Sequence, residues 1–127
     1  MKIKVIDASK LEKRHACWGY SIVPTTTYEV LAIKQVHRKR QYLVEDDMRL
    51  IWWDADLFNV VEEIIPKEWI KLQYKRFHRP RNKKYNFKLA MDCFWGPNEF
   101  LENEDFLFDI YENPHTAYAF YKGLHKH

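Results

Sequence analysis

The fold of this chain is decided by residues 27–63, which read TYEVLAIKQVHRKRQYLVEDDMRLIWWDADLFNVVEE. In this stretch, short runs of β-branched and aromatic residues alternate with highly charged segments. Such runs are typical of strands, and charged segments between them are typical of hairpin turns. We therefore expect strands at residues 28–36, 41–45, 50–53 and 58–64. The expected turns are 37–40 and 46–49.

A helical turn is expected at residues 54–57, between the last two of these strands. Asp54 is its expected N-cap, because a carboxylate can accept a hydrogen bond from a free backbone amide. Pro66 then ends the closing strand. The alternation KIKVI at residues 2–6 predicts a further strand at the beginning of the chain.

The order of hairpin, hairpin, helical turn and short last strand resembles a Src-homology-3-like barrel. The resemblance rests on YEVL at 28–31, WDADLF at 53–58 and VVE at 60–62, and it covers residues 1–65. The pattern looks like a family of small barrels that is widespread in bacteria and has an unknown or interaction-related role. It departs from the eukaryotic peptide-binding domains, because their acidic loop and proline-binding aromatic pair cannot be placed in this sequence. Binding of proline-rich peptides is therefore not implied.

The second half of the chain has a different pattern and predicts a mixed strand and helix extension. Residues 95–98 (WGPN) are expected to form a turn. Asn103 is the expected N-cap of a helix whose first turn is acidic, which suits the helix dipole. Pro114 is expected at the first position of a last helix, where proline is tolerated.

The expected fold class is therefore α+β, with an antiparallel Src-homology-3-like barrel followed by a helical C-terminal extension. Residues 1–65 form the barrel in this interpretation. Residues 66–127 pack on it, so that the chain is a single compact unit.

The composition predicts a folded, cytoplasmic protein. Hydrophobic residues make up 46% of the chain and aromatic residues 17%, which is ample for a core. No apolar run approaches the roughly 20 residues of a membrane-spanning helix, and MKIKVIDASK contains no signal-peptide core. Only Cys17 and Cys93 are present, so a reduced protein without a disulfide framework is the default.

No catalytic, metal or cofactor motif stands out, and we expect a protein that is not an enzyme. The carboxylate pairs fall in predicted turns and helix starts, where acidic residues serve structure. The six histidines are scattered without zinc-ligand spacing. The three glycines are far apart, which excludes a phosphate-cradling loop.

Charge is distributed in blocks of one sign. Residues 71–88 contain eight basic residues and no acid, whereas residues 92–112 contain seven acids and no Lys or Arg. One interpretation is that the blocks neutralise each other across the folded surface. The other is that one block steers an oppositely charged partner.

Trp52 and Trp53 are adjacent, so they point to opposite faces of a strand. One can enter the core of the barrel. The other either packs against the C-terminal half or is an exposed anchor in an interface, where Trp and Tyr are favoured.

A small aromatic-rich domain without catalytic residues and with a dense acidic segment resembles bacterial immunity proteins. These proteins bind and neutralise a secreted or contact-delivered toxin in bacterial competition. Many such toxins are basic nucleases, and an acidic face would speed association with one. The expected steering residues are Glu99, Glu102, Glu104, Asp105 and Asp109. The expected anchors are Trp95, Phe100 and Tyr111.

The alternative function is nucleic-acid binding by basic residues interleaved with aromatic ones. Lys and Arg contact phosphates, and aromatic rings stack on bases. The residues of this alternative are Arg38, Lys39, Arg40, Lys75, Arg76, Arg79, Arg81, Lys83 and Lys84.

Overall fold

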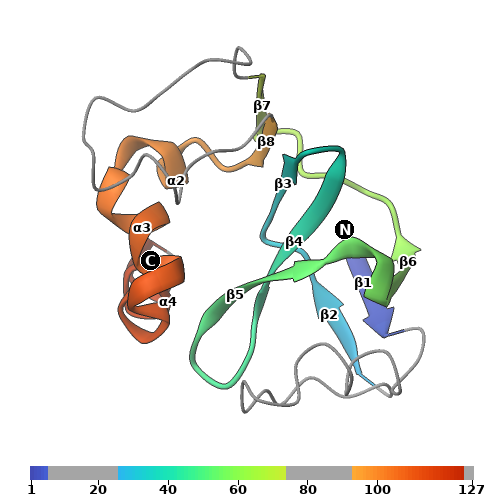
Figure 1. The fold of residues 1–127 in the computed structure, drawn as a ribbon, viewed down its shortest axis with the longest axis horizontal. Helices are drawn as coiled ribbons and strands as arrows, with labels where there is room; N and C mark the ends of the chain where they lie inside the picture. The colour runs from blue at the N-terminus through green and yellow to red at the C-terminus, as the bar shows by residue number, and fades with distance from the viewer. Residues whose placement is uncertain (6–25, 74–92, 125–127) are drawn as a thin grey trace.

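The computed structural model of the protein describes residues 1–5, 26–73 and 93–124. Within these ranges the strands form two antiparallel sheets, and helices follow them near the C-terminus (Figure 1). The expected α+β class is confirmed. The two sheets are not closed into a barrel, so the sequence predicted the strands but not how the sheets are joined.

The smaller sheet has the strand order β2–β1–β6, and the larger has the order β5–β4–β3–β8–β7. The strands of the smaller sheet are β1 (Lys2–Val5), β2 (Thr27–Glu29) and β6 (Phe58–Glu62). Those of the larger sheet are β3 (Ala32–Val36), β4 (Lys39–Glu45), β5 (Leu50–Asp54), β7 (Ile70–Gln73) and β8 (Cys93–Gly96). The helices are the 3-10 helix η1 (Ala55–Leu57), α2 (Glu99–Glu102), α3 (Glu104–Glu112) and α4 (Pro114–Leu124).

The single strand expected at 28–36 is divided into β2 and β3. At the break, the amide of Val30 donates to the carbonyl of Met1 at 2.9 Å, and the amide of Leu31 donates to the carbonyl of Leu43 at 2.8 Å. Val30 is thus bonded toward the smaller sheet and Leu31 toward the larger one. The chain passes from one sheet to the other at this point without a glycine or proline.

Both predicted hairpin turns are confirmed, and both are tight two-residue turns. The backbone φ angles are 50° and 69° at His37 and Arg38, and 51° and 58° at Asp47 and Met48. Positive φ at both central positions is the geometry of type I′ turns, whose twist matches that of the flanking strands. Because β4 begins at Lys39, the first turn is shorter than the expected 37–40.

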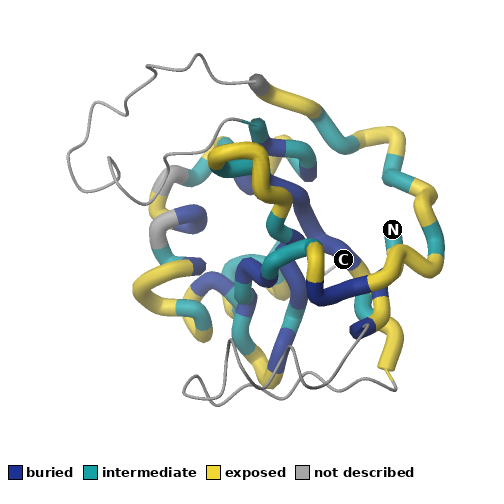
Figure 2. The backbone as a smooth tube through the Cα atoms, turned by 45° about the vertical axis from the view of Figure 1, so that its right-hand side comes forward, coloured by how far each residue is buried: buried dark blue, intermediate teal, exposed yellow. Residues whose placement is uncertain are grey.

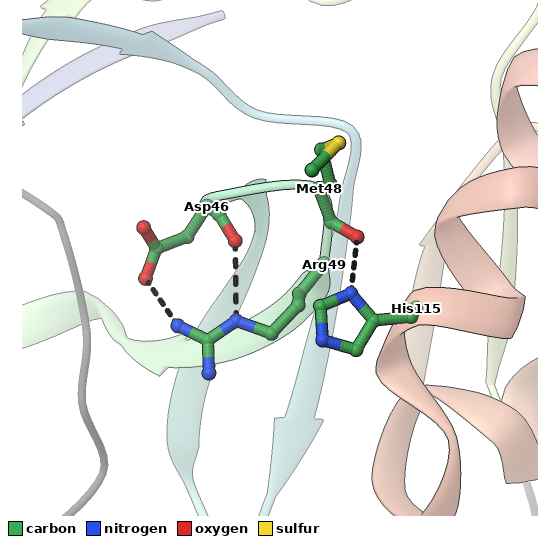
Figure 3. A network of polar contacts seen from close by, with 4 residues as sticks. All are labelled: Asp46, Met48, Arg49 and His115. Carbon is green, nitrogen blue, oxygen red and sulfur yellow. Dashed lines mark hydrogen bonds and ion pairs between the residues drawn. The ribbon is translucent and has the colours of Figure 1, made fainter.

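The second turn is fastened to the helical layer (Figure 3). The Arg49 guanidinium donates to the backbone carbonyl of Asp46 at 3.3 Å and pairs with its buried carboxylate at 3.4 Å. His115 Nδ1, on α4, lies 3.0 Å from the backbone oxygen of Met48. These contacts fix the β4–β5 hairpin against the start of α4.

The larger sheet lies between the smaller sheet and the helices (Figure 1). Leu43 pairs with Trp52, and both belong to the cluster that contains Phe106 and Ile110 of α3. Trp53 faces the other way and packs with residues of β1 and β6. Figure 2 shows that the buried residues gather in the middle of the molecule. The two tryptophans therefore lie on opposite faces as predicted, and Trp52 packs against the C-terminal half.

The helix starts at Asn103 and Pro114 are confirmed. The Asn103 side chain accepts a hydrogen bond from the Asp105 amide at 3.0 Å, which satisfies one free donor of α3. Pro114 is the first residue of α4. Asp54 is the N-cap of η1, but the expected side-chain cap bond is absent there. Its Oδ1 instead accepts from Gln41 Nε2 at 3.0 Å, across the β4–β5 pair.

The prediction of a turn at residues 95–98 is wrong for its first two residues. Trp95 and Gly96 end β8, where they pair with Ile33 of β3 and with Lys71 and Ile70 of β7. A β-carbon at Gly96 would lie 2.9 Å from the Cβ of Ala32, so the close approach of the backbone requires glycine. Most of the basic block at residues 71–88 lies outside the described residues.

Candidate functional site

A cleft of about 540 Å³ lies between the strands and the C-terminal helices. We call it the acidic–aromatic cleft. Four segments far apart in the sequence meet in it: the β2–β3 junction, the approach to β7, the residues around the start of α2, and the end of α4. Its lining residues are Glu29, Val30, Leu31, Pro66, Glu68, Trp69, Pro97, Glu99, Phe100, Tyr121 and Leu124.

The charged residues of the cleft are all acidic. Glu29, Glu68 and Glu99 are exposed, and each comes from a different segment. No Lys or Arg is among the described lining residues. Three carboxylates without a balancing cation at the wall give the cleft a negative potential, which attracts cationic groups.

The aromatic residues of the cleft are Trp69, Phe100 and Tyr121. Phe100 is buried and packs edge-on against the Tyr121 ring, with ring centres 6.2 Å apart. Burial raises the pKa of the Tyr121 phenol, and the carboxylates of Glu29 and Glu45 raise it further. The Tyr121 phenol therefore stays protonated and neutral. Its raised pKa reflects the negative charge of the nearby carboxylates as well as burial.

The lining is suited to binding a cationic group. A partly exposed aromatic face next to carboxylates can hold an ammonium or guanidinium group by ion pairing and by cation–π attraction. The described lining contains no Ser, Cys or His that would serve as nucleophile or general base. Across residues 1–5, 26–73 and 93–124, no group of three or more His, Cys, Asp or Glu is placed to hold a metal ion.

The predicted acidic surface is only partly assembled in this cleft. Glu99 lines it, whereas Glu102 and Asp105 are exposed on α2 and α3 outside it. Asp109 is half-buried, and its Oδ1 accepts from Asn113 Nδ2 at 3.2 Å. Glu104 begins α3, but its side chain lies outside the description.

The three expected anchors lie in different places. Phe100 is 1% exposed, so its ring forms part of the core beneath the cleft instead of projecting toward a partner. Trp95 packs with the cluster between the two sheets, and Lys71 Nζ lies 5.0 Å from its ring centre. Tyr111 is 38% exposed on α3, on the other face of the larger sheet. Trp95 and Tyr111 therefore do not share one surface.

Sequence reasoning missed Glu29, Glu68, Trp69 and Tyr121 as site residues. Glu68 stands next to Trp69, and the pair directly follows Pro66 and Lys67, which was a local signal of an exposed acidic and aromatic segment. No local signal joins Glu29 to Tyr121, because they are distant in the sequence and meet only through the packing of α4.

The basic residues of the alternative site are described only at the first hairpin. Arg38, Lys39 and Arg40 are exposed and line a second cavity, of about 380 Å³. Asp54 and Asp56 line the same cavity, so its positive charge is partly offset. The remaining residues lie outside the described ranges: Lys75, Arg76, Arg79, Arg81, Lys83 and Lys84.

No protein-family model, curated protein or solved structure matches this chain. Among the residues that the structure describes, no helix is long and apolar enough to cross a membrane.

Proposed function

We propose that this protein is a non-catalytic binding module that receives a basic segment of a protein partner in the acidic–aromatic cleft. The observation that carries the proposal is the meeting of Glu29, Glu68 and Glu99 around two partly exposed aromatic rings. A lysine or arginine side chain of the partner fits this lining, because its charge meets carboxylates and its stem meets apolar atoms.

The partner that suits such a cleft is a bacterial toxin, and the protein is then its cytoplasmic immunity protein. Nuclease toxins carry basic surfaces because they bind a phosphate backbone. An acidic inhibitor surface would raise the rate of encounter with such a toxin and compete with its substrate. Glu102 and Asp105, exposed beside the cleft, extend the negative surface along α2 and α3.

The strand order supports a relationship with Src-homology-3-like barrels, here in an open form. β1 pairs with both β2 and β6, and β3, β4 and β5 follow as a meander. The single turn η1 separates β5 from β6, as the expected helical turn would. In this interpretation the C-terminal helices add a wall to the barrel-like part and create the cleft between them.

The test is capture of the partner with matched variants. The wild-type chain is used as bait in nuclease-treated lysate of the native cell, and captured proteins are identified by mass spectrometry. We expect one stoichiometric polypeptide that the double variant E29K/E99K no longer captures. The variant E112K, which changes an exposed acid outside the cleft, should capture it as well as the wild type does.

Neutralisation is tested separately by expressing the captured protein in a heterologous bacterium. Growth should stop without the immunity protein, resume with the wild type or E112K, and fail to resume with E29K/E99K. Equal rescue by E29K/E99K would show that the cleft is not the working surface. A captured protein that has no effect on growth would contradict the toxin assignment while leaving protein binding in place.

Nucleic-acid binding is the second candidate, because Arg38, Lys39 and Arg40 gather at one exposed hairpin. It predicts that affinity for single-stranded RNA or DNA falls steeply as salt increases. Fluorescence anisotropy with a labelled oligonucleotide measures this dependence. Absence of binding at about 50 mM salt would rule the candidate out.

A further inference from the structure

Lys34 is a lysine in the interior of the molecule, at the contact between the larger sheet and the helices. It lies on β3 and is only 3% exposed. Its Nζ atom lies 4.8 Å from the centre of the Trp52 ring on β5 and 4.3 Å from that of the Tyr111 ring on α3. The amine therefore sits where α3 meets the sheet, and water has little access to it while α3 stays in place.

The groups around this amine come from several elements. The carboxylate of Asp54 on β5 favours the protonated amine, but burial outweighs it and lowers the pKa of Lys34 to about 7. The Tyr111 phenol is the titratable group that α3 brings to the amine. On β4 and β8, the residues paired with Lys34 are Gln41 and Phe94, which are uncharged.

Other polar contacts between the helices and the strands involve α4 and the β4–β5 hairpin. His115 Nδ1 lies 3.0 Å from the backbone oxygen of Met48, and Lys122 pairs with Glu45 at 3.8 Å. Arg49 is paired within its own hairpin turn. Of these residue types, histidine is the one whose charge ordinarily changes near neutral pH, so His115 needs a control of its own.

The three helices are joined to one another by a run of aromatic rings. The ring centres of Phe100 on α2 and Phe106 on α3 are 4.6 Å apart, and those of Phe106 and Phe120 on α4 are 4.9 Å apart. Tyr121 on α4 packs edge-on against Phe100, with ring centres 6.2 Å apart. The helices lie side by side in Figure 1. A displacement of α3 from the sheet would therefore carry α2 and α4 with it as one layer.

We propose that α2, α3 and α4 form a proton-sensitive layer, which leaves the larger sheet more often when Lys34 is protonated. In the closed arrangement the charged amine is buried between two rings, which replace only part of its lost hydration. In the open arrangement the amine reaches water, where its charged form is stable. Protonation therefore raises the population of the open state.

The same layer carries part of the acidic–aromatic cleft. Glu99 and Phe100 of α2 and Tyr121 and Leu124 of α4 line the cleft together with Glu29 of β2. Opening moves the helical part of the lining away from the strands, so a lower pH weakens binding in the cleft. This consequence rests on the proposed function, whereas the opening itself does not.

The test is hydrogen exchange of backbone amides in the full chain, read by NMR at pH 6.5, 7.5 and 8.5 and corrected for the intrinsic exchange rate. For the amides of α3 we expect an opening equilibrium constant that is at least about tenfold larger at pH 6.5 than at pH 8.5, because the open state binds the proton of Lys34 more firmly. The amides of Leu43 and Val44 in β4 should stay more strongly protected than those of α3, because the sheet remains formed.

Matched variants assign the change to Lys34. K34M and K34L are two neutral variants that should remove it, and circular dichroism establishes that they are folded. K39M, which changes an exposed lysine on β4, and H115Q should keep it. D54N removes the carboxylate that favours the protonated amine, so it should make the change larger.

Protection of α3 that does not change with pH in the wild type would overturn the proposal, and so would a change that persists in both neutral variants. Equal protection of the α3 and β4 amides would overturn it as well, because the chain would then open only by complete unfolding. The exchange experiment needs no partner, so its result is independent of the proposed function. A partner that binds equally at pH 6.5 and 8.5 while the exchange result holds would contradict the cleft as the binding surface and leave the opening in place.

Discussion

The Nζ atom of Lys34 lies 4.3 Å from the centre of the Tyr111 ring, and this contact joins the larger sheet to helix α3. The same atom lies 4.8 Å from the centre of the Trp52 ring on β5. Aromatic faces attract a cation, but they replace only part of the hydration that a buried ammonium loses. The contact therefore joins the helix to the sheet, whereas the burial of the amine makes the protonated form of Lys34 costly.

The stability of the protein is expected to depend on the protonation of Lys34. Its pKa is about 7 in the folded protein, against 10.5 in the unfolded chain. Between these values the unfolded chain binds more protons, so the free energy of unfolding rises with pH, by an amount on the order of 5 kcal/mol across the window. The pKa values of Tyr42 and Tyr121 are raised by burial, so their ionisation in the unfolded chain lowers stability above pH 10. Urea denaturation at pH 6, 7, 8 and 9 measures the rise.

The variant K34M should abolish the rise between pH 7 and 9. It should also increase the free energy of unfolding at pH 7 by about 1–3 kcal/mol, because a methionine fills the position without a charge. K39M is the matched control, since Lys39 is exposed on β4, and it should retain the wild-type pH dependence. A rise that persists in K34M would show that another group causes it.

Replacement by alanine should have opposite effects on stability at Gly96 and Gly123, the two glycines that the structure describes. A β-carbon at Gly96 would lie 2.9 Å from Ala32 Cβ and 3.0 Å from Phe94 Cζ, and Phe94 is fully buried. G96A should therefore lower the free energy of unfolding by about 1–3 kcal/mol through overpacking.

At Gly123, on the last turn of α4, nothing lies within 4 Å of the added carbon. G123A should be neutral or stabilising by up to about 1 kcal/mol, because alanine favours the helix. Urea denaturation of both variants at one pH makes the comparison. Equal effects of the two substitutions would contradict the close approach of β8 to β3.

The features of the fold that could be predicted depend on local chemistry. The charged turns at His37 and Asp47 separate strands whose alternation of residue types is visible in the sequence. Each turn could be predicted because its geometry involves only two central residues. The opposite faces of Trp52 and Trp53 follow from the two-residue period of a strand. The cap at Asn103 follows from its own side chain and the amide of Asp105.

The features that could not be predicted depend on pairing between distant segments. The break between β2 and β3 at Val30 and Leu31 is caused by backbone bonds to Met1 and Leu43, and no residue type marks it. β7 pairs with β8 across the segment 74–92. The candidate cleft likewise takes Glu29 and Tyr121 from distant parts of the chain, so only Glu99 and Phe100 of its lining could be proposed from the sequence.

The contribution of the N-cap of α3 to stability can be tested by replacing a single side chain. N103A removes the acceptor for the Asp105 amide, and we expect a loss of about 1 kcal/mol in the free energy of unfolding. N103S keeps a capping oxygen and should retain most of the wild-type stability. Thermal and urea denaturation of the pair measure the difference, and an N103A variant as stable as the wild type would mean that α3 does not depend on this bond.

The hairpin between β4 and β5 offers a stabilising substitution. Met48 adopts φ 58°, a left-handed conformation that costs a residue with a β-carbon roughly 1–2 kcal/mol and costs glycine almost nothing. Its side chain is 62% exposed, so M48G removes little buried area. It also creates the sequence Asp-Gly, which type I′ turns favour. We expect M48G to raise the free energy of unfolding by about 1 kcal/mol.

The contact between this hairpin and α4 should survive the substitution, because His115 bonds to the backbone oxygen of residue 48 and not to its side chain. M48V is the opposing control, since a β-branched residue is strongly disfavoured at positive φ, and it should be less stable than the wild type. Urea denaturation should therefore rank the three proteins as M48G, wild type and M48V. If M48G were the least stable, the left-handed conformation at residue 48 would be wrong, and with it the two-residue turn that aligns Leu43 with Trp52.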